Sequence, residues 1–285
     1  MKKIFIHIGV GKTGTTSIQD SMMLHREEIA SQGVLYPLTG LEETGHQDLV
    51  VLWQDEFSPE IVSMYSQLLR EFEESQKPTM LISSEKFCFA NGEFVRNIAR
   101  ALKGYDVKII IYVRAQIAQI ESTFLLWLRL GYFYGESFDT FFETHLGSFD
   151  YNRIVSPWAV FFGEKAIVAR AYDHPQLKTD AFSGIKEILG INTASPERQF
   201  SNQSLIPELT QLLCAVDQTS PESFLRERIM EAALDISSKF KRHSVNRLMD
   251  AEKTHRVKDY YLMPNFEFSR RFLPEEDSAF FLSNI

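Results

Sequence analysis

Short apolar runs alternate with amphipathic segments along most of the first two thirds of the chain. Runs at residues 4–8, 79–83, 107–113 and 165–170 predict strands, and the first is β-branched and aromatic, as buried strands are. Apolar positions at helical spacing mark the segments between them, at residues 15–29, 59–74, 91–102, 117–128 and 151–162. Strands separated by helices predict an α/β fold, with a parallel β-sheet and helices on both of its faces.

The remaining patterns are weaker. Residues 33–37 fit a short strand or an extended turn, and residues 46–53 fit a short helix. The last third of the chain is expected to be mostly helical, because residues 205–216 and 223–240 have helical spacing.

The chain shows no internal repeat, low-complexity tract or long linker. We therefore expect a single domain over residues 1–285. Its core is expected at about 1–205, followed by a helical C-terminal extension at about 206–285.

A glycine-rich turn, residues 9–14, separates the first strand from the first helix. The free N–H groups and the dipole at a helix N-terminus attract phosphate-like anions. Lys12 adds a positive charge, and hydroxyl donors follow at Thr13, Thr15, Thr16 and Ser17. Helix capping alone would need fewer of these groups. The turn therefore predicts an anion-binding loop.

The spacing of this loop distinguishes between two kinds of anion. A nucleoside-triphosphate loop has the pattern G-x-x-x-x-G-K-[ST]. Gly11, Lys12 and Thr13 match its end, but its first glycine would fall on Ile6, inside the strand.

The run Lys12-Thr13-Gly14-Thr15-Thr16 instead resembles the 5′-phosphosulfate loop of the sulfotransferases, including their bacterial members. These enzymes use 3′-phosphoadenosine 5′-phosphosulfate (PAPS) and release 3′,5′-bisphosphoadenosine (PAP). The resemblance implies a P-loop-like sulfotransferase fold. The cofactor-binding residues that it implies in this loop are Gly11, Lys12, Thr13, Gly14, Thr15, Thr16 and Ser17.

A second motif follows the strand at residues 107–113, which ends on Arg114, with Ser122 eight positions later. Arginine presents a planar fork to phosphate oxygens, and serine adds a donor. Along one continuous helix the two residues would lie ~12 Å apart, so the chain must turn after Arg114 if both bind one phosphate. The arrangement is similar to the 3′-phosphate-binding element of the sulfotransferases. The alternative is an arginine at a strand end and a serine inside an amphipathic helix.

A third motif lies near the start of the last third. Arg198, Asn202 and Ser204 resemble an [Arg/Lys]-x-x-x-Asn-x-Ser-Leu segment of bacterial sulfotransferases. In those proteins the segment closes over the nucleotide, which implies cofactor binding by these three residues. Asn202 or Ser204 could also cap a helix that begins at Pro207, and the two roles are compatible.

Transfer to an acceptor requires a base that takes its proton. Glu85 follows the strand at residues 79–83, where partial burial could raise its pKa. In the glycan-modifying branch of the sulfotransferases a glutamate has this role, and in the branch that acts on small phenols and steroids a histidine has it. Glu85 is therefore our candidate base, and His46 is the histidine candidate or a helper on the substrate side.

Composition limits the remaining possibilities. The net charge of −8 and a pI near 5.5 argue against broad affinity for nucleic acid or anionic membranes. No uncharged apolar stretch approaches the ~20 residues that span a bilayer. Cys88 and Cys214 form no disulfide framework, so a reducing, cytoplasmic environment is expected. No His/Cys cluster, H-E-x-x-H or D-x-D pattern suggests a metal.

The resemblance carried by these motifs implies a PAPS-dependent sulfotransferase whose acceptor is a hydroxyl or amine, on a glycan, lipid, peptide or small molecule. One alternative is a P-loop kinase or nucleotidase with Glu85 as its magnesium-binding acid. The missing first glycine and the arginine after Val113 count against it. The other alternative is a silent nucleotide-binding module of the same fold, against which the intact Lys12 and Glu85 count.

Overall fold

The chain folds into two compact units. The computed structural model describes residues 1–51, 57–130, 137–172, 181–194, 205–206, 209–210, 212–214, 223–240 and 248–284. Unit 1 comprises residues 1–114, 151–196 and 263–284, and unit 2 comprises residues 115–150 and 197–262 with residue 285.

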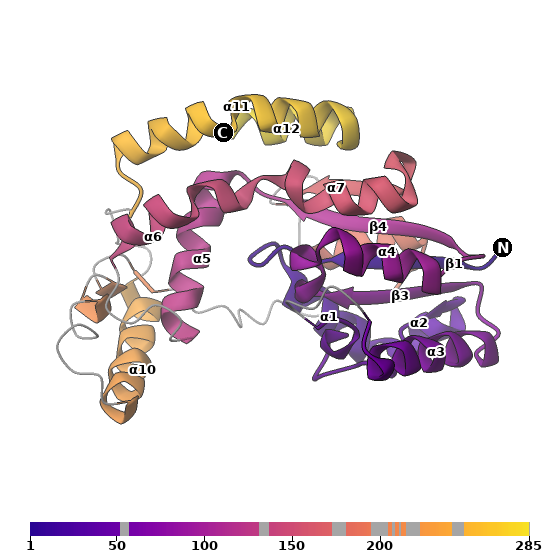
Figure 1. Cartoon of the computed structure of the whole chain (residues 1–285). Coiled ribbons are helices and arrows are strands. Elements are labelled where there is room, and N and C mark those ends of the chain that lie inside the picture. The colour runs from indigo at the N-terminus through magenta and orange to yellow at the C-terminus, as the bar shows by residue number, and fades with distance from the viewer. Residues whose placement is uncertain are drawn as a thin grey trace. The chain divides into compact units, whose positions relative to one another are not determined.

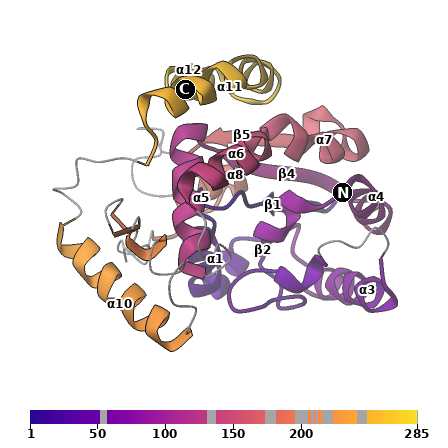
Figure 2. The same ribbon diagram turned by 60° about the vertical axis from the view of Figure 1, so that its left-hand side comes forward.

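A parallel β-sheet organises unit 1 (Figure 1). Its described strands are β1 (Lys3–Ile8), β2 (Val34–Leu35), β3 (Thr79–Ser84), β4 (Asp106–Val113) and β5 (Ile167–Ala171). They lie in the order β2-β3-β1-β4-β5, and every neighbouring pair is parallel. The labelled strands β5, β4, β1 and β2 follow one another in this order in Figure 2. The predicted parallel α/β sheet is confirmed.

Alternating side chains of β1 divide the core of unit 1 into two layers. On one face Ile4, Ile6 and Ile8 pack into a cluster with α3 (Pro59–Glu74), α4 (Gly92–Ala101), α7 (Tyr151–Phe162) and α12 (Glu275–Ser283). On the other face Phe5 packs with α1 (Thr15–Leu24), α2 (Arg26–Ser31) and α8 (Ala181–Leu189). Helices therefore cover both faces, as the spacing predicts.

The strongest helical patterns give helices with the predicted bounds, at residues 59–74, 151–162 and 223–240. Of the short helix predicted at residues 46–53, the described part holds a single 3-10 turn, η1 (Gln47–Leu49), with His46 at its N-cap and extended backbone at Val50. The strand predicted at 165–170 begins later, as β5, after the 3-10 turn η4 (Glu164–Ala166).

Unit 2 is helical over its described residues. It contains α5 (Gln116–Leu130), α6 (Phe138–His145), the 3-10 turn η3 (Leu146–Phe149), α10 (Ser223–Phe240) and the first part of α11 (Ala251–Phe272). Buried side chains of these elements form one apolar cluster, which includes Phe124, Phe141 and Tyr261. The expectation of a mostly helical C-terminal part is confirmed, although much of the helix predicted at 205–216 lies outside the described residues.

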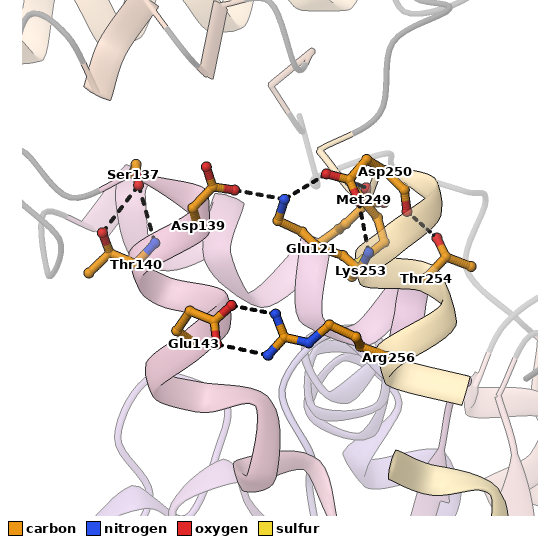
Figure 3. Close-up of polar contacts among 10 residues, drawn as sticks. All are labelled: Glu121, Ser137, Asp139, Thr140, Glu143, Met249, Asp250, Lys253, Thr254 and Arg256. Atoms are coloured by element: carbon orange, nitrogen blue, oxygen red, sulfur yellow. Dashed lines mark hydrogen bonds and ion pairs between the residues drawn. The ribbon is translucent and has the colours of Figure 1, made fainter. Parts of the chain in front are cut away.

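Charged side chains fix the start of α11 to α6 (Figure 3). Arg256 donates hydrogen bonds of 2.5 and 2.8 Å to the two carboxylate oxygens of Glu143. The ammonium of Lys253 lies 2.8 Å from Asp139 and 2.7 Å from Asp250. The bidentate geometry of the arginine pair gives this contact a defined orientation.

Candidate functional site

The loop at residues 9–14 links the end of β1 to the start of α1 in a strained conformation. Lys12 has φ 68° and Gly14 has φ 81°, both in the left-handed region. For a residue with a side chain this region costs about 1–2 kcal/mol. Such strain gathers at functional sites, because the surrounding structure must hold it. The backbone of Lys12 would suit glycine better, which favours a chemical role for its side chain.

Close approaches explain the glycines of this loop. A Cβ on Gly9 would lie 2.6 Å from the side chain of Thr15. A Cβ on Gly14 would lie 2.7 Å from the Cβ of Ala181 in α8 and 3.0 Å from the ring of Tyr172. The turn therefore packs tightly against α1 and α8, with no room for larger residues at these two positions.

The threonine hydroxyls of the loop differ in exposure. Thr13 and Thr15 are buried, and their hydroxyls donate to the carbonyl of Val10 at 2.6 and 3.5 Å. These two hydroxyls stabilise the turn, so that the backbone N–H groups of both residues are the donors to consider for a ligand. Thr16 is exposed and Ser17 is half-buried, at the first turn of α1.

Glu85 lies beside this loop, because β3 pairs with β1 and the two strands end together at Ile8 and Ser84. Glu85 is the next residue, the first of the 3-10 turn η2 (Glu85–Phe89). Burial raises the pKa of its carboxyl, and the positive charge of Lys12 opposes that rise. The structure thus brings Lys12 and Glu85 into electrostatic contact.

Arg114 lies on the other side of the loop strand, at the end of β4. Its backbone N–H donates to the Tyr151 hydroxyl at 3.0 Å, and that hydroxyl donates to the Arg114 carbonyl at 2.7 Å. The guanidinium lies 5.6 Å from the centre of the Tyr172 ring. The backbone and the side chain of Arg114 are thus both held by tyrosines.

Tyr172 is a further candidate site residue, which sequence reasoning missed. Its backbone N–H donates to the carbonyl of Val113 at 2.7 Å, directly after β5. The ring contacts the position of Gly14 and lies against Arg114, so it connects the loop with the arginine. An aromatic residue two positions after the strand predicted at residues 165–170 is the available signal, because ligands gather at the carboxyl ends of parallel strands.

The structure does not place four of the predicted cofactor-binding residues relative to this group. Ser122 belongs to α5 of unit 2, where its hydroxyl donates to the carbonyl of Gln119 at 3.1 Å. Its predicted convergence with Arg114 stays a prediction. Arg198, Asn202 and Ser204 lie outside the described residues, and their predicted role also stays a prediction.

His46 is fully buried, and both of its ring nitrogens contact backbone groups. Nδ1 accepts the N–H of Ser83 at 3.2 Å, and Nε2 lies 3.0 Å from the carbonyl of Pro37, which makes Nε2 the donor. Burial lowers the pKa of His46 to about 4. A neutral imidazole with both nitrogens occupied is suited to holding the backbone, and Glu85 is the better-placed candidate base.

Among the described residues, no group of three or more His, Cys, Asp or Glu side chains could hold a metal ion. No helix there has both the length and the apolar character to cross a membrane.

Comparison with known proteins finds solved structures that are similar to this chain. No protein-family model and no curated protein matches the chain. The chain is similar to a sulfotransferase from Alicyclobacillus acidocaldarius, with a TM-score of 0.46 and 15% identity over 82% of this chain and 96% of that one. It is also similar to the mouse sulfotransferase SULT7A1, solved as a complex with PAP, with a TM-score of 0.38 and 16% identity over 94% of this chain and 85% of that one.

Proposed function

We propose that this chain is a PAPS-dependent sulfotransferase that acts on a hydroxyl or amine of an acceptor. The observation that supports this most directly is the pair formed by Lys12 and Glu85. A strained lysine at a helix N-terminus and a carboxyl with a raised pKa act on each other across adjacent strand ends. A cation for a leaving group and a base for an acceptor are the two groups that in-line group transfer needs.

The residues around this pair fit a nucleotide with phosphates at two positions. The loop offers Lys12 and the free N–H groups at the start of α1 to a 5′-phosphosulfate. Arg114 offers its guanidinium at the end of the neighbouring strand, which suits a 3′-phosphate. Arg198, Asn202, Ser204 and Ser122 complete the proposed set on the strength of their motifs alone.

The bound nucleotide supplies the activated sulfuryl group. Lys12 and the first N–H groups of α1 stabilise the negative charge that develops on the leaving phosphate. Glu85 accepts the proton of the acceptor while the acceptor oxygen or nitrogen bonds to sulfur and the bond from sulfur to the 5′-phosphate breaks. Burial makes the Glu85 carboxylate more basic, and Lys12 helps to keep it ionised.

Replacing the carboxylate tests this assignment. Glu85→Gln is expected to fold and to bind PAP normally, and to lose about 10²–10⁴-fold in kcat, because a general base acts only during proton transfer. The measurement is PAP release from PAPS with a panel of glycan and phenol acceptors. Glu74→Gln, at an exposed position in α3, is the control and should keep full activity.

Two results would contradict the proposal. A loss of PAP binding in Glu85→Gln would make Glu85 a structural partner of Lys12. Magnesium-dependent transfer of phosphate from ATP by the unmodified protein would instead support the kinase alternative, with Glu85 as the metal-binding acid.

A further inference from the structure

Near Glu85, the edge of β3 that faces β2 bonds to a loop instead of a strand. The neighbouring strand β2 pairs with β3 only at Thr79 and Met80. At Ser83 a loop residue replaces the missing strand: the His46 N–H donates to the Ser83 carbonyl at 2.7 Å, and the Ser83 N–H donates to His46 Nδ1 at 3.2 Å. One histidine thus satisfies both backbone groups of Ser83.

Gln47 continues this pattern on the residues next to Glu85. The Ser84 hydroxyl donates to Gln47 Oε1 at 2.5 Å and accepts the N–H of Lys86 at 3.1 Å. The Lys86 ammonium donates to the Gln47 carbonyl at 3.2 Å. The residues on both sides of Glu85 are therefore tied to the same loop.

Ser83 also connects this loop with α1. Gln19 of α1 donates to the Ser83 hydroxyl at 3.2 Å and to its carbonyl at 3.4 Å, and the hydroxyl lies 2.8 Å from His7 Nδ1. A Cβ on Gly45 would lie 2.8 Å from the Gln19 amide, so the glycine leaves room for this contact. Since α1 begins at the Lys12 loop, the network joins the Lys12 side of the site to the Glu85 side.

We infer that His46 and Gln47, which we name the His46–Gln47 clamp, position Glu85 relative to Lys12. The inference rests on the proposed function, since it assigns both residues as positioning residues for the transfer. No hydrogen bond joins the Glu85 carboxylate to another described residue, and the short turn η2 provides few backbone bonds. The residues on either side must therefore place this side chain, and the clamp binds the backbone of Ser83 and the side chains of Ser84 and Lys86.

The charged and titratable groups recorded around Glu85 come from two elements. Lys12 acts on it from the loop. From η2, Cys88 donates through its thiol to the Glu85 carbonyl at 3.1 Å, and Lys86 turns toward Glu42 and the Gln47 carbonyl. A looser clamp would let water reach Glu85, which lowers the pKa of its carboxyl.

Gln47→Ala tests the clamp, because it removes the acceptor of the Ser84 hydroxyl. The chain offers a matched control in Gln67→Ala, which removes another glutamine–serine contact, to Ser63 on the exposed face of α3. The pKa of Glu85 is measured by carbon-13 NMR of the glutamate carboxyls, with Glu85→Gln identifying its signal. Calorimetry with PAP and the PAPS transfer assay accompany the titration.

If the clamp positions Glu85, Gln47→Ala should lower the pKa of Glu85 and leave the Kd for PAP unchanged. The kcat should fall by about 10–10²-fold, because a small misplacement of a reacting group reduces the rate by about that much. Ser84→Ala removes the same bond from the other side and also the acceptor of the Lys86 N–H, so it should lower the pKa of Glu85 at least as far. The double variant should show no change beyond that of Ser84→Ala, since Gln47→Ala removes a bond that Ser84→Ala already removes. Gln67→Ala should match the original protein.

An unchanged Glu85 pKa and kcat in both Gln47→Ala and Ser84→Ala would overturn the inference. A fall in thermal stability with an unchanged titration would also overturn it, because the bonds would then support the fold alone. The NMR titration needs neither acceptor nor nucleotide. A shifted pKa in a protein that does not bind PAP would support the clamp and contradict the proposed function.

Discussion

At Lys12, an unfavourable backbone conformation lowers stability at a position where the side chain has a proposed chemical role. Lys12 adopts a backbone conformation that costs a residue with a side chain about 1–2 kcal/mol, at the one position of the loop that has an ammonium group. Glycine would adopt the same conformation without that cost, although it loses about 0.5–1 kcal/mol through its greater freedom in the unfolded chain. The lysine is therefore explained by what its side chain does.

Lys12→Gly is expected to abolish transfer and to leave the unfolding free energy unchanged or raised by up to about 1 kcal/mol. Lys12→Ala should also abolish transfer but keep the backbone strain, so its unfolding free energy should lie below that of Lys12→Gly. Urea denaturation and the PAPS assay measure the two quantities. A Lys12→Gly variant that is both less stable than Lys12→Ala and still active would disprove the role of the lysine.

Sequence reasoning proposed candidate site residues at strand ends, but it could not foresee the environment of His46, for a physical reason. Arg114 directly follows a predicted strand, Glu85 lies two residues after another, and Lys12 lies in the loop after a third. The carboxyl ends of parallel strands share one edge of the sheet. The environment of His46 depends on Pro37 and Ser83, which only the folded chain brings to it. A local pattern cannot distinguish such a histidine from one that faces a substrate.

Among the elements, the loop whose His46 bonds to Ser83 of β3 has the clearest consequence for stability. His46 is buried and neutral there, and its pKa falls from 6.5 to about 4. Because the unfolded chain binds a proton at higher pH than the folded one, this group contributes stability above pH 6.5 that is lost as the pH falls through its folded pKa. The loss by pH 4 is on the order of 3 kcal/mol. His7 acts in the same direction, with a pKa lowered to about 3 by burial.

His46→Gln is therefore expected to flatten the dependence of unfolding free energy on pH between 7 and 4, measured by urea denaturation at several pH values. The variant should also be less stable at pH 7, because the contacts of His46 with Ser83 and Pro37 change. Glu85 acts with the opposite sign, since its raised pKa favours the folded state as the pH falls, and it is present in both proteins. Equal slopes in both proteins would show that His46 does not titrate in this way.

The elements themselves were predictable where periodicity was strong. The amphipathic helices at residues 59–74 and 151–162 and the strand before Arg114 follow from side-chain spacing alone. The 3-10 turns η1 and η2 do not, because a few residues give no period and tertiary bonds to Ser83 and Gln47 fix them. The short helix α6 is rich in phenylalanine, and its spacing gives too few positions to recognise.

The whole molecule combines two units, each with its own apolar core. Two clusters cover the faces of the sheet in unit 1, and a separate cluster fills the helical unit 2. Sequence reasoning expected a helical C-terminal part, but it had no signal that residues 115–150 would group with residues 197–262. With a net charge of −8, an anionic nucleotide must be held by nearby groups, among which Lys12 and Arg114 are the proposed ones.

The most direct test of the central claim is titration calorimetry with PAP in the absence of magnesium, compared with ATP in its presence. We predict that PAP binds with a Kd of about 1 μM or lower and that ATP with magnesium binds much more weakly. Arg114→Ala should weaken PAP binding by about 10–100-fold, because a charge-assisted contact with the 3′-phosphate contributes about 1.5–3 kcal/mol, and should leave adenosine 5′-monophosphate unaffected. A preference for ATP with magnesium would contradict the sulfotransferase assignment.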